Sequence, residues 1–176
     1  MSCVKEKRKN KKGKYEIPFS IIHGNAWGPS CVTSYSGFRW LISFIDGYIH
    51  ITRIYLLKEK FEVAVIFKSF HTISQNQFHT KIQVFWTYNG REYFNNVLIL
   101  PNKMEWHRKN RHLLEVSRAL QFTPNVPKIC WNYAVFTAAY LINNMPFKAL
   151  NSKTHVHVLK ALFPNVNLFM SRVPSS

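Results

Sequence analysis

The stretch F-R-W-L-I-S-F-I-D-G-Y-I-H-I-T-R-I-Y-L-L, residues 38–57, holds two runs rich in isoleucine, phenylalanine, tyrosine and tryptophan. These side chains favour β-strands. The dipeptide Asp46-Gly47 between the runs supplies the positive φ angles of a two-residue type I′ turn. The pattern therefore predicts a long antiparallel hairpin with strands over residues 38–45 and 48–57.

Apolar segments on both sides of this hairpin predict the rest of a mixed sheet. Residues 19–27 are β-prone and end at a Gly-Pro pair, and residues 81–87 alternate like a strand and end near an Asn-Gly pair. Residues 58–78 repeat apolar side chains every three or four positions, as an amphipathic helix does. Residues 108–122 and 127–144 predict two further helices. This order of strands and helices indicates an α/β domain.

The charge balance narrows the class of partner. The chain has 24 Lys and Arg against 8 Asp and Glu, so its formal net charge is 24 − 8 = +16. Because 47% of its 176 residues are hydrophobic and 15% are aromatic, it is able to bury a core and is no disordered basic tail. A folded protein with this charge favours a polyanion such as nucleic acid as its partner.

The sequence divides into three parts. Residues 1–17 form a basic N-terminal arm, residues 18–146 hold the predicted domain, and residues 147–176 form a C-terminal extension with a short helix and a flexible tail. Because the charges of the arm repel one another, we expect it to stay unfolded until a polyanion neutralises it. A nucleic-acid contact, a nuclear address and a solvated tail all stay open as its role.

Cysteine and histidine usage gives no sign of a metal or disulfide framework. The three cysteines are odd in number and show no C-x-x-C spacing. His155 and His157 have the H-x-H spacing of some metal sites, but no Cys, Asp or Glu lies near them, which favours a structural role. The longest apolar stretch, residues 133–142, is too short to span a bilayer, and no apolar segment of a signal peptide follows the basic N-terminus. We therefore expect an intracellular, nuclear protein without a membrane span.

Several segments together resemble the integrase core of copia-type long-terminal-repeat retrotransposons, which belong to the retroviral integrase superfamily. They follow the family's order: P-F-S-I-I-H-G-N-A-W-G-P-S (residues 18–30), S-G-F-R-W-L-I-S-F-I-D (36–46), Y-L-L-K-E-K-F-E-V (55–63), N-G-R-E-Y-F-N-N (89–96), R-K-N-R-H-L-L-E-V-S-R-A-L (108–120) and Y-L-I-N-N-M-P (140–146). The resemblance implies a ribonuclease-H-like mixed sheet flanked by helices. It also implies a phosphoryl-transfer activity that cuts and joins DNA, and a homodimer as a possible assembly.

In that family three carboxylates hold divalent metal ions, usually magnesium, because such hard cations prefer anionic oxygen ligands. The resemblance places these three positions at Asn25, Tyr88 and His107. An asparagine cannot be anionic, a phenol with an ordinary pKa of about 10 is neutral, and an imidazole favours softer metals than magnesium. No catalytic carboxylate is therefore predicted to be intact, and the metal site is predicted to be lost. Glu92 and Glu105 are the acids left near these positions in the sequence.

A second departure is a missing segment. Tyr88 and His107 are 107 − 88 = 19 positions apart, too few for the helix and strand that the family has there. We therefore expect the fold to lack its last core strand and a helix, although the four aliphatic residues 97–100 are able to supply a short substitute strand. Residues 97–106 also match the family segment C-V-D-T-P-Q-Q-N-G-V-A-E when suitable codons for it are read one base later. Our hypothesis is a frameshifted, internally deleted remnant, which the sequence of the locus would test.

The resemblance places the start of the helix at residue 108 beside the catalytic centre and in contact with DNA. The predicted nucleic-acid-binding residues lie there and in the arm: Lys7, Arg8, Lys9, Lys11, Lys12, Arg108, Lys109 and Arg111. The sequence thus predicts a catalytically inactive integrase-core remnant that retains, at most, nonspecific nucleic-acid binding. Three alternatives stay open: an active metal-dependent polynucleotidyl transferase, a host-adopted nucleic-acid-binding or inhibitor module, and a reading frame with no stable product.

Overall fold

The computed structural model describes residues 17–87, 98–101, 104–122 and 126–166, and of residues 98–101 and 104–107 it describes the backbone. In this part of the chain five strands form a sheet in the order β3-β2-β1-β4-β5. The strands are β1 Ile21–Trp27, β2 Trp40–Asp46, β3 Thr52–Leu57, β4 Val84–Thr87 and β5 Leu98–Pro101. β1, β2 and β3 pair antiparallel, whereas β4 pairs in parallel with both β1 and β5. The predicted α/β mixed sheet is confirmed.

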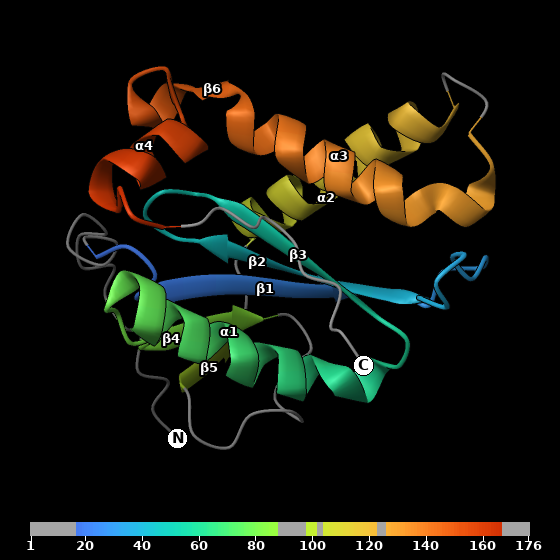
Figure 1. Cartoon of the computed structure of the whole chain (residues 1–176), viewed down its shortest axis with the longest axis horizontal. Helices are drawn as coiled ribbons and strands as arrows, with labels where there is room; N and C mark the ends of the chain where they lie inside the picture. The colour runs from blue at the N-terminus through green and yellow to red at the C-terminus, as the bar shows by residue number, and fades with distance from the viewer. Residues whose placement is uncertain (1–16, 88–97, 102–103, 123–125, 167–176) are drawn as a thin grey trace, which may run out of the picture.

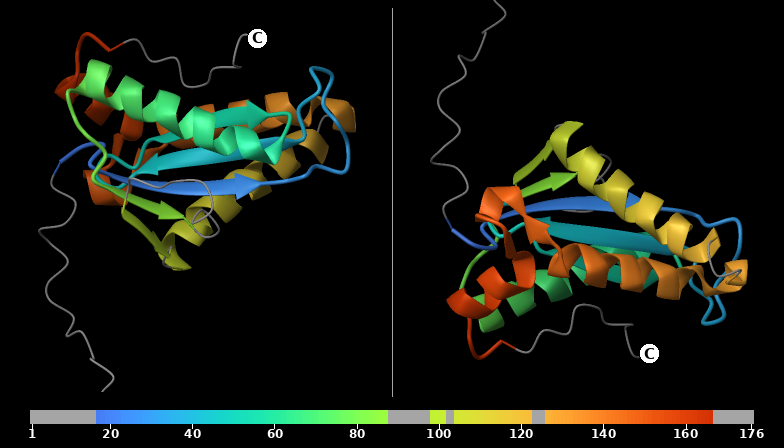
Figure 2. Two further views of the ribbon diagram at one scale, coloured as in Figure 1. Left: turned by 90° about the horizontal axis from the view of Figure 1, so that it is seen from below. Right: turned by 90° about the horizontal axis from the view of Figure 1, so that it is seen from above.

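Helices cover both faces of this sheet. Helix α1 lies on one face, and α2 and α3 lie together on the other (Figure 1). Figure 2 shows the same layers from the α1 side and from the opposite side. The α-helices are α1 Val63–Phe78, α2 Met104–Phe122, α3 Trp131–Asn144 and α4 His155–Leu162; the 3-10 helices are η2 Lys60–Glu62, η3 Lys128–Cys130 and η4 Lys148–Leu150. A two-stranded ribbon, β6 Pro146–Phe147 and β7 Lys153–Thr154, joins α3 to α4. No helix in the described ranges is both long and apolar enough to cross a membrane.

The face of the sheet beneath α1 carries an aromatic core. The rings of Phe44 on β2 and Phe70 on α1 stack with centroids 4.6 Å apart, and those of Phe67 and Phe85 meet at 4.5 Å. All four side chains are buried. The apolar spacing that predicts a helix over residues 58–78 is thus the buried face of α1, and each such side chain contributes about 1.5–3 kcal/mol on burial.

Helices α2 and α3 bury the opposite face, and Asn143 ties α3 to the edge of the sheet. Leu41, Leu56 and Leu113 belong to the apolar cluster between these helices and the sheet. Asn143 is fully buried: its Oδ1 accepts the backbone N–H of Thr52 at 2.8 Å, and its Nδ2 donates to the Thr52 carbonyl at 2.7 Å. Because β3 is an edge strand, its outer backbone groups would otherwise lack partners in the sheet.

The turn after β2 differs from the prediction. β2 ends at Asp46 and β3 begins at Thr52, so five residues join the strands. Within this loop the positive φ angle, 66°, belongs to His50 rather than to Gly47. The predicted two-residue type I′ turn at Asp46-Gly47 is therefore wrong.

The side chain of Asp46 explains the longer loop. Its Oδ2 accepts the backbone N–H groups of Tyr48 at 3.0 Å and Ile49 at 2.6 Å, which folds the loop around the carboxylate. Its Oδ1 accepts the N–H of Phe19 at 2.7 Å, just before β1. Burial raises the pKa of Asp46 to about 6, and the backbone N–H donors partly oppose that rise. The only aspartate of the chain thus has a structural role.

The sheet contains the last strand that the sequence was expected to lack. β5 pairs in parallel with β4, from Val84 opposite Leu98 to Thr87 opposite Pro101. The free edge of β4 offers unpaired backbone donors and acceptors, and a short aliphatic run is compatible with a strand there. The substitute strand predicted at residues 97–100 is confirmed to within one residue. The helix that was expected to be missing would fall within residues 88–97, which lie outside the described residues.

The bond between Asn143 and Thr52 predicts unequal effects of two neighbouring substitutions. Asn143→Ala leaves a buried N–H and a buried carbonyl of Thr52 unpaired, so we expect the free energy of unfolding to fall by about 2–4 kcal/mol. The control is Asn144→Ala: this side chain is exposed and donates to the Tyr140 carbonyl of its own helix, so the expected change is within about 0.5 kcal/mol. Urea unfolding measures both, and equal losses would contradict the role of Asn143.

Candidate functional site

Polar side chains gather where β1 and β2 pass beneath α2. Asn25 on β1 and Ser43 on β2 are directly opposite in the sheet, so both side chains leave it on the same face. Ser43 Oγ lies 2.5 Å from Oδ1 of Asn110 on α2 and 3.3 Å from the Asn25 carbonyl oxygen. A hydroxyl has one proton, which the shorter distance assigns to Asn110. Ser43 and Asn110 are buried and Asn25 is half-buried, so the cluster is neutral and shielded from water.

The end of β4 reaches the same place. Parallel pairing puts Thr87, the last residue of β4, beside Gly24, the residue before Asn25. Position 88 follows directly in the chain, and position 107 lies three residues before Asn110 in α2. Position 25 therefore lies on β1 and position 107 lies in α2, while position 88 is the next one in the chain after β4. Tyr88 and the side chain of His107 lie outside the described part of the chain.

The described side chains of this cluster do not fit a hard divalent cation. Magnesium takes near-octahedral oxygen ligands, and carboxylates supply the negative charge that repays its dehydration. Asn25, Ser43 and Asn110 offer neutral oxygens, and the amide oxygen of Asn110 already accepts the Ser43 hydroxyl. Among the described residues, no three His, Cys, Asp or Glu side chains are grouped so that they could hold a metal ion. Glu92 and the side chain of Glu105 lie outside the described residues.

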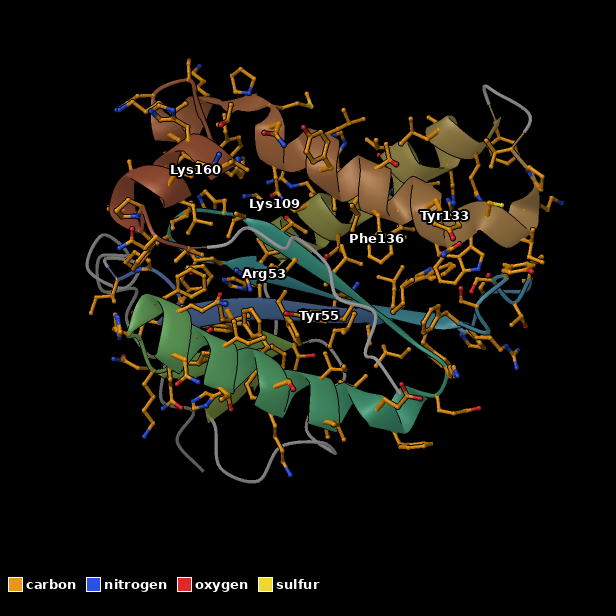
Figure 3. The ribbon with its side chains drawn as sticks, viewed as in Figure 1. Arg53, Tyr55, Lys109, Tyr133, Phe136 and Lys160 are labelled. Carbon is orange, nitrogen blue, oxygen red and sulfur yellow. The ribbon has the colours of Figure 1, made fainter. Side chains whose placement is uncertain are left out.

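The basic residues at the start of α2 point in two directions. Arg108 and Arg111 are exposed, and Arg111 Nε forms a surface ion pair with Glu115 at 3.1 Å. Lys109 turns inward: its Nζ lies 4.7 Å from the ring centroid of Phe147. Figure 3 shows Lys109 between the sheet and helices α3 and α4. Of the three predicted nucleic-acid-binding residues on α2, the structure thus places two at the surface and one inside.

Three curated proteins are similar to this chain over most of its length. The retrovirus-related Pol polyproteins from transposons RE1 and RE2 of Arabidopsis thaliana are 29% and 28% identical to it over 163 and 167 residues. The one from transposon TNT 1-94 of Nicotiana tabacum is 27% identical over 143 residues. These matches cover 84%, 84% and 72% of this chain, which spans 11% of the length of each relative. No protein-family model matches the sequence.

Solved structures share the fold. The catalytic core domain of HTLV-2 integrase, solved with magnesium in a dimeric and a trimeric form, superposes with a TM-score of 0.56 at 15% identity, over 81% of this chain and 97% of that one. A chain of the simian T-cell lymphotropic virus intasome with the PP2A regulatory subunit B56 gamma gives the same TM-score and identity, over 91% of this chain and 59% of that one. This chain is similar to copia-type retrotransposon Pol polyproteins over most of its length, and it has the fold of integrase catalytic cores. The ribonuclease-H-like fold and the resemblance noted in the sequence are both confirmed.

In this chain a further departure from the family pattern lies next to Asn25. The pattern H-S-D-V-W-G-P reads His23-Gly24-Asn25 at its start here, so glycine replaces serine. A Cβ atom at Gly24 would lie 2.2 Å from Cζ of Phe85, a buried residue of the adjacent strand β4. A side chain at position 24 and the present ring at position 85 therefore exclude each other.

Other basic residues and the cysteines lie in other segments of the chain. The arm residues lie outside the described part of the chain: Lys7, Arg8, Lys9, Lys11 and Lys12. Lys58 and Lys68 are exposed, but Lys68 belongs to α1, which covers the face opposite α2 (Figure 1). Cys31 and Cys130 are free thiols. Sequence reasoning missed Ser43, a polar residue inside an apolar strand, and Asn110, a neutral residue inside the basic run R-K-N-R-H.

The contact between positions 24 and 85 predicts an energetic coupling. Gly24→Ser should lower the free energy of unfolding by about 1–3 kcal/mol, because Phe85 must move to admit the side chain. Ala26→Ser, an exposed change on the same strand, should stay within about 0.5 kcal/mol. Phe85→Leu, which lacks Cζ, should recover part of the Gly24→Ser loss in a double-mutant cycle measured by chemical unfolding. Strictly additive effects would rule out the contact.

Proposed function

We propose that this integrase-core relative binds nucleic acid nonspecifically and does not catalyse metal-dependent cutting or joining of DNA. The observation that supports this proposal is the neutral cluster of Asn25, Ser43 and Asn110 at the place where two strands and α2 meet. A two-metal phosphoryl transfer needs anionic ligands that hold cations at the attacking and leaving oxygens. Binding of a polyanion has no such requirement, because surface cations and the counterions they release are sufficient.

The charges around this cluster support the binding step. Arg108 and Arg111 flank Asn110 on α2 and are exposed, so they lie beside the cluster and face solvent. The ion pair between Arg111 and Glu115 is between side chains that are 81% and 56% exposed. Such pairs contribute little, so Arg111 stays available to a phosphate. The net charge of +16 adds a long-range attraction to any polyanion.

The proposal predicts DNA binding that depends on salt but not on magnesium. In fluorescence anisotropy, unrelated duplexes should bind with similar affinity, EDTA should have no effect, and the affinity should fall steeply with salt. Arg108→Gln with Arg111→Gln should weaken binding and reduce the slope of log affinity against log salt by about two. The control is Lys58→Gln with Lys68→Gln, which removes the same charge from exposed positions away from α2 and should have the smaller effect.

Two outcomes would contradict this proposal. One is binding that requires magnesium, because the neutral cluster would then be holding a metal ion. The other is an equal loss of affinity in the α2 pair and in its control, because net charge alone would then account for the binding.

We also propose that the chain forms a homodimer through α3. Tyr133 and Tyr140 lie two turns apart on this helix and are each 58% exposed, and Leu141 is 39% exposed. Contiguous apolar patches on a protein surface often mark an interaction site. The HTLV-2 integrase core, which shares the fold, is described in a dimeric form. A second copy of this chain is therefore the partner that we propose for this face.

The homodimer predicts a change of mass when the face becomes charged. Tyr133→Lys with Tyr140→Lys should turn a dimer into a monomer in sedimentation velocity, because two ammonium groups would have to be desolvated in the interface. Tyr35→Lys, at a side chain that is 83% exposed in the loop between β1 and β2, should leave the dimer intact. A wild-type chain that stays monomeric at tens of micromolar would contradict the proposal.

A further inference from the structure

A cavity of about 440 Å³ lies between α2, the C-terminal end of α3 and the N-terminal end of α4. Its polar lining comes from Arg108, Lys109 and His112 on α2, from His155 on α4 and from Thr52 on β3. Apolar residues of α2, α3 and β6 complete the wall, among them Leu113, Ile142 and Phe147. None of the described residues that line the cavity is acidic. It is therefore a cation-rich space with an apolar wall.

Lys109 gives this cavity a fixed positive charge. Its Nζ has almost no contact with solvent and lies 4.7 Å from the ring centroid of Phe147. A cation–π contact of this kind is attractive and does not neutralise the ammonium charge. Away from water, the attraction between such a charge and an incoming anion is stronger than at the surface. Arg108, which is exposed, adds a second cation at the rim.

His155 gives the cavity a polar group that has no hydrogen bond. Its side chain is 4% exposed, and its Nδ1 has no hydrogen-bond partner in the described structure. Leaving such a buried nitrogen without a hydrogen bond is energetically unfavourable, because it has lost its contact with water. Burial, and after it the charge of Lys109, lowers the pKa of His155 to about 4, so the ring is neutral at pH 7 and one of its nitrogens carries an N–H donor. A ligand oxygen in the cavity would relieve this cost.

A second histidine lies beside the first. The ring of His50 is 6.4 Å from that of His155, and Phe147 contacts both, with centroids at 5.4 and 5.2 Å. Burial, then Lys109 and His155, lowers the pKa of His50 to about 3. The positive charge that an anion meets at pH 7 is thus that of Lys109 and Arg108, and the imidazoles act as neutral polar groups.

We propose that this cavity is a binding site for a phosphomonoester that carries an apolar or aromatic group. A phosphomonoester has a charge of about −2 at neutral pH, which matches two cations better than a single carboxylate does. Inorganic phosphate alone would leave most of the 440 Å³ empty, whereas an attached apolar group would pack against Leu113, Ile142 and Phe147. The site shares Arg108 with the proposed nucleic-acid surface but is otherwise distinct from it, because neither Asn25 nor Arg111 lines it.

Phenyl phosphate is the probe, and isothermal titration at pH 7 with the full chain is the first measurement. Lys109→Met removes the inner charge but keeps a long apolar side chain over Phe147, so we expect the affinity to fall by about tenfold or more. Arg111→Met removes the same charge from an exposed position on the same helix and should change the affinity by less than about twofold. An equal loss in both variants would overturn the site.

Wild-type measurements keep the proposal testable if the Lys109 variant does not fold. Phenyl phosphate should move the imidazole proton resonances of His155 but not those of His157, which is exposed on the same short helix. His155→Gln should weaken binding, and His157→Gln should not. Shifts at His157 without shifts at His155 would overturn the placement of the ligand.

Comparison of ligands tests its chemistry. Phenol and inorganic phosphate should each bind about tenfold more weakly than phenyl phosphate, because each lacks half of the contacts. Phenol that binds as well as phenyl phosphate would overturn the anion site. Duplex DNA without terminal phosphates should not displace the probe; full displacement would assign the cavity to the nucleic-acid backbone and overturn a small-molecule site. Failure here leaves the DNA-binding test untouched, because that test compares the Arg108 and Arg111 pair with the Lys58 and Lys68 pair and uses neither Lys109 nor His155.

Discussion

The buried carboxylate of Asp46 fixes the geometry on which the centre of this molecule depends. Its hydrogen bonds hold the residue before β1 and the loop after β2, so they set the register in which Ile22 faces Asp46 and Asn25 faces Ser43. Burial removes water from this carboxylate and so destabilises its charged form, and the backbone N–H groups that donate to it offset part of this effect. The chain has one aspartate, and its side chain joins the segment before β1 to the loop after β2.

Local patterns in the sequence were sufficient for most of the fold. Each strand of the predicted hairpin and each helical stripe is formed by residues close together in the chain, so period and propensity reveal it. The loop after β2 was mispredicted because the Asp-Gly pattern does not reveal that the Asp46 carboxylate accepts the N–H groups of Tyr48 and Ile49, which gives a longer loop. The pairing of β5 with the free edge of β4 depends on the arrangement of the whole sheet, which the short aliphatic run does not reveal by itself.

The site was harder to predict because its contacts join distant parts of the chain. Ser43 and Asn110 are 67 positions apart, and nothing in either segment announces their hydrogen bond. The basic run at the start of α2 gave no sign that Lys109 turns inward while Arg108 stays exposed. That difference depends on the contact of Lys109 with Phe147, a residue that follows α3 in the chain and is therefore far from Lys109 in the sequence. The composition predicted a polyanion as partner, but it did not predict which cationic side chains face solvent and which turn inward.

Fold and catalysis place different demands on a sequence, so on our proposal the fold persists here without the residues that catalysis needs. A short parallel strand requires aliphatic residues and a free edge, and residues 97–100 meet that requirement even on our hypothesis that they are read out of frame. A metal ligand requires a particular oxygen at a particular place. Asn25, Ser43 and Asn110 offer oxygen atoms where β1, β2 and α2 meet, but these oxygens are neutral.

The most direct measurement is DNA strand transfer by the purified full chain in the presence of Mg²⁺ or Mn²⁺, with a reaction lacking protein as its reference. We expect no joined product above that reference, because the described cluster offers neutral oxygens to a cation that needs charged ones. Joined product that requires the metal and disappears on Glu92→Gln or Glu105→Gln would contradict the central claim.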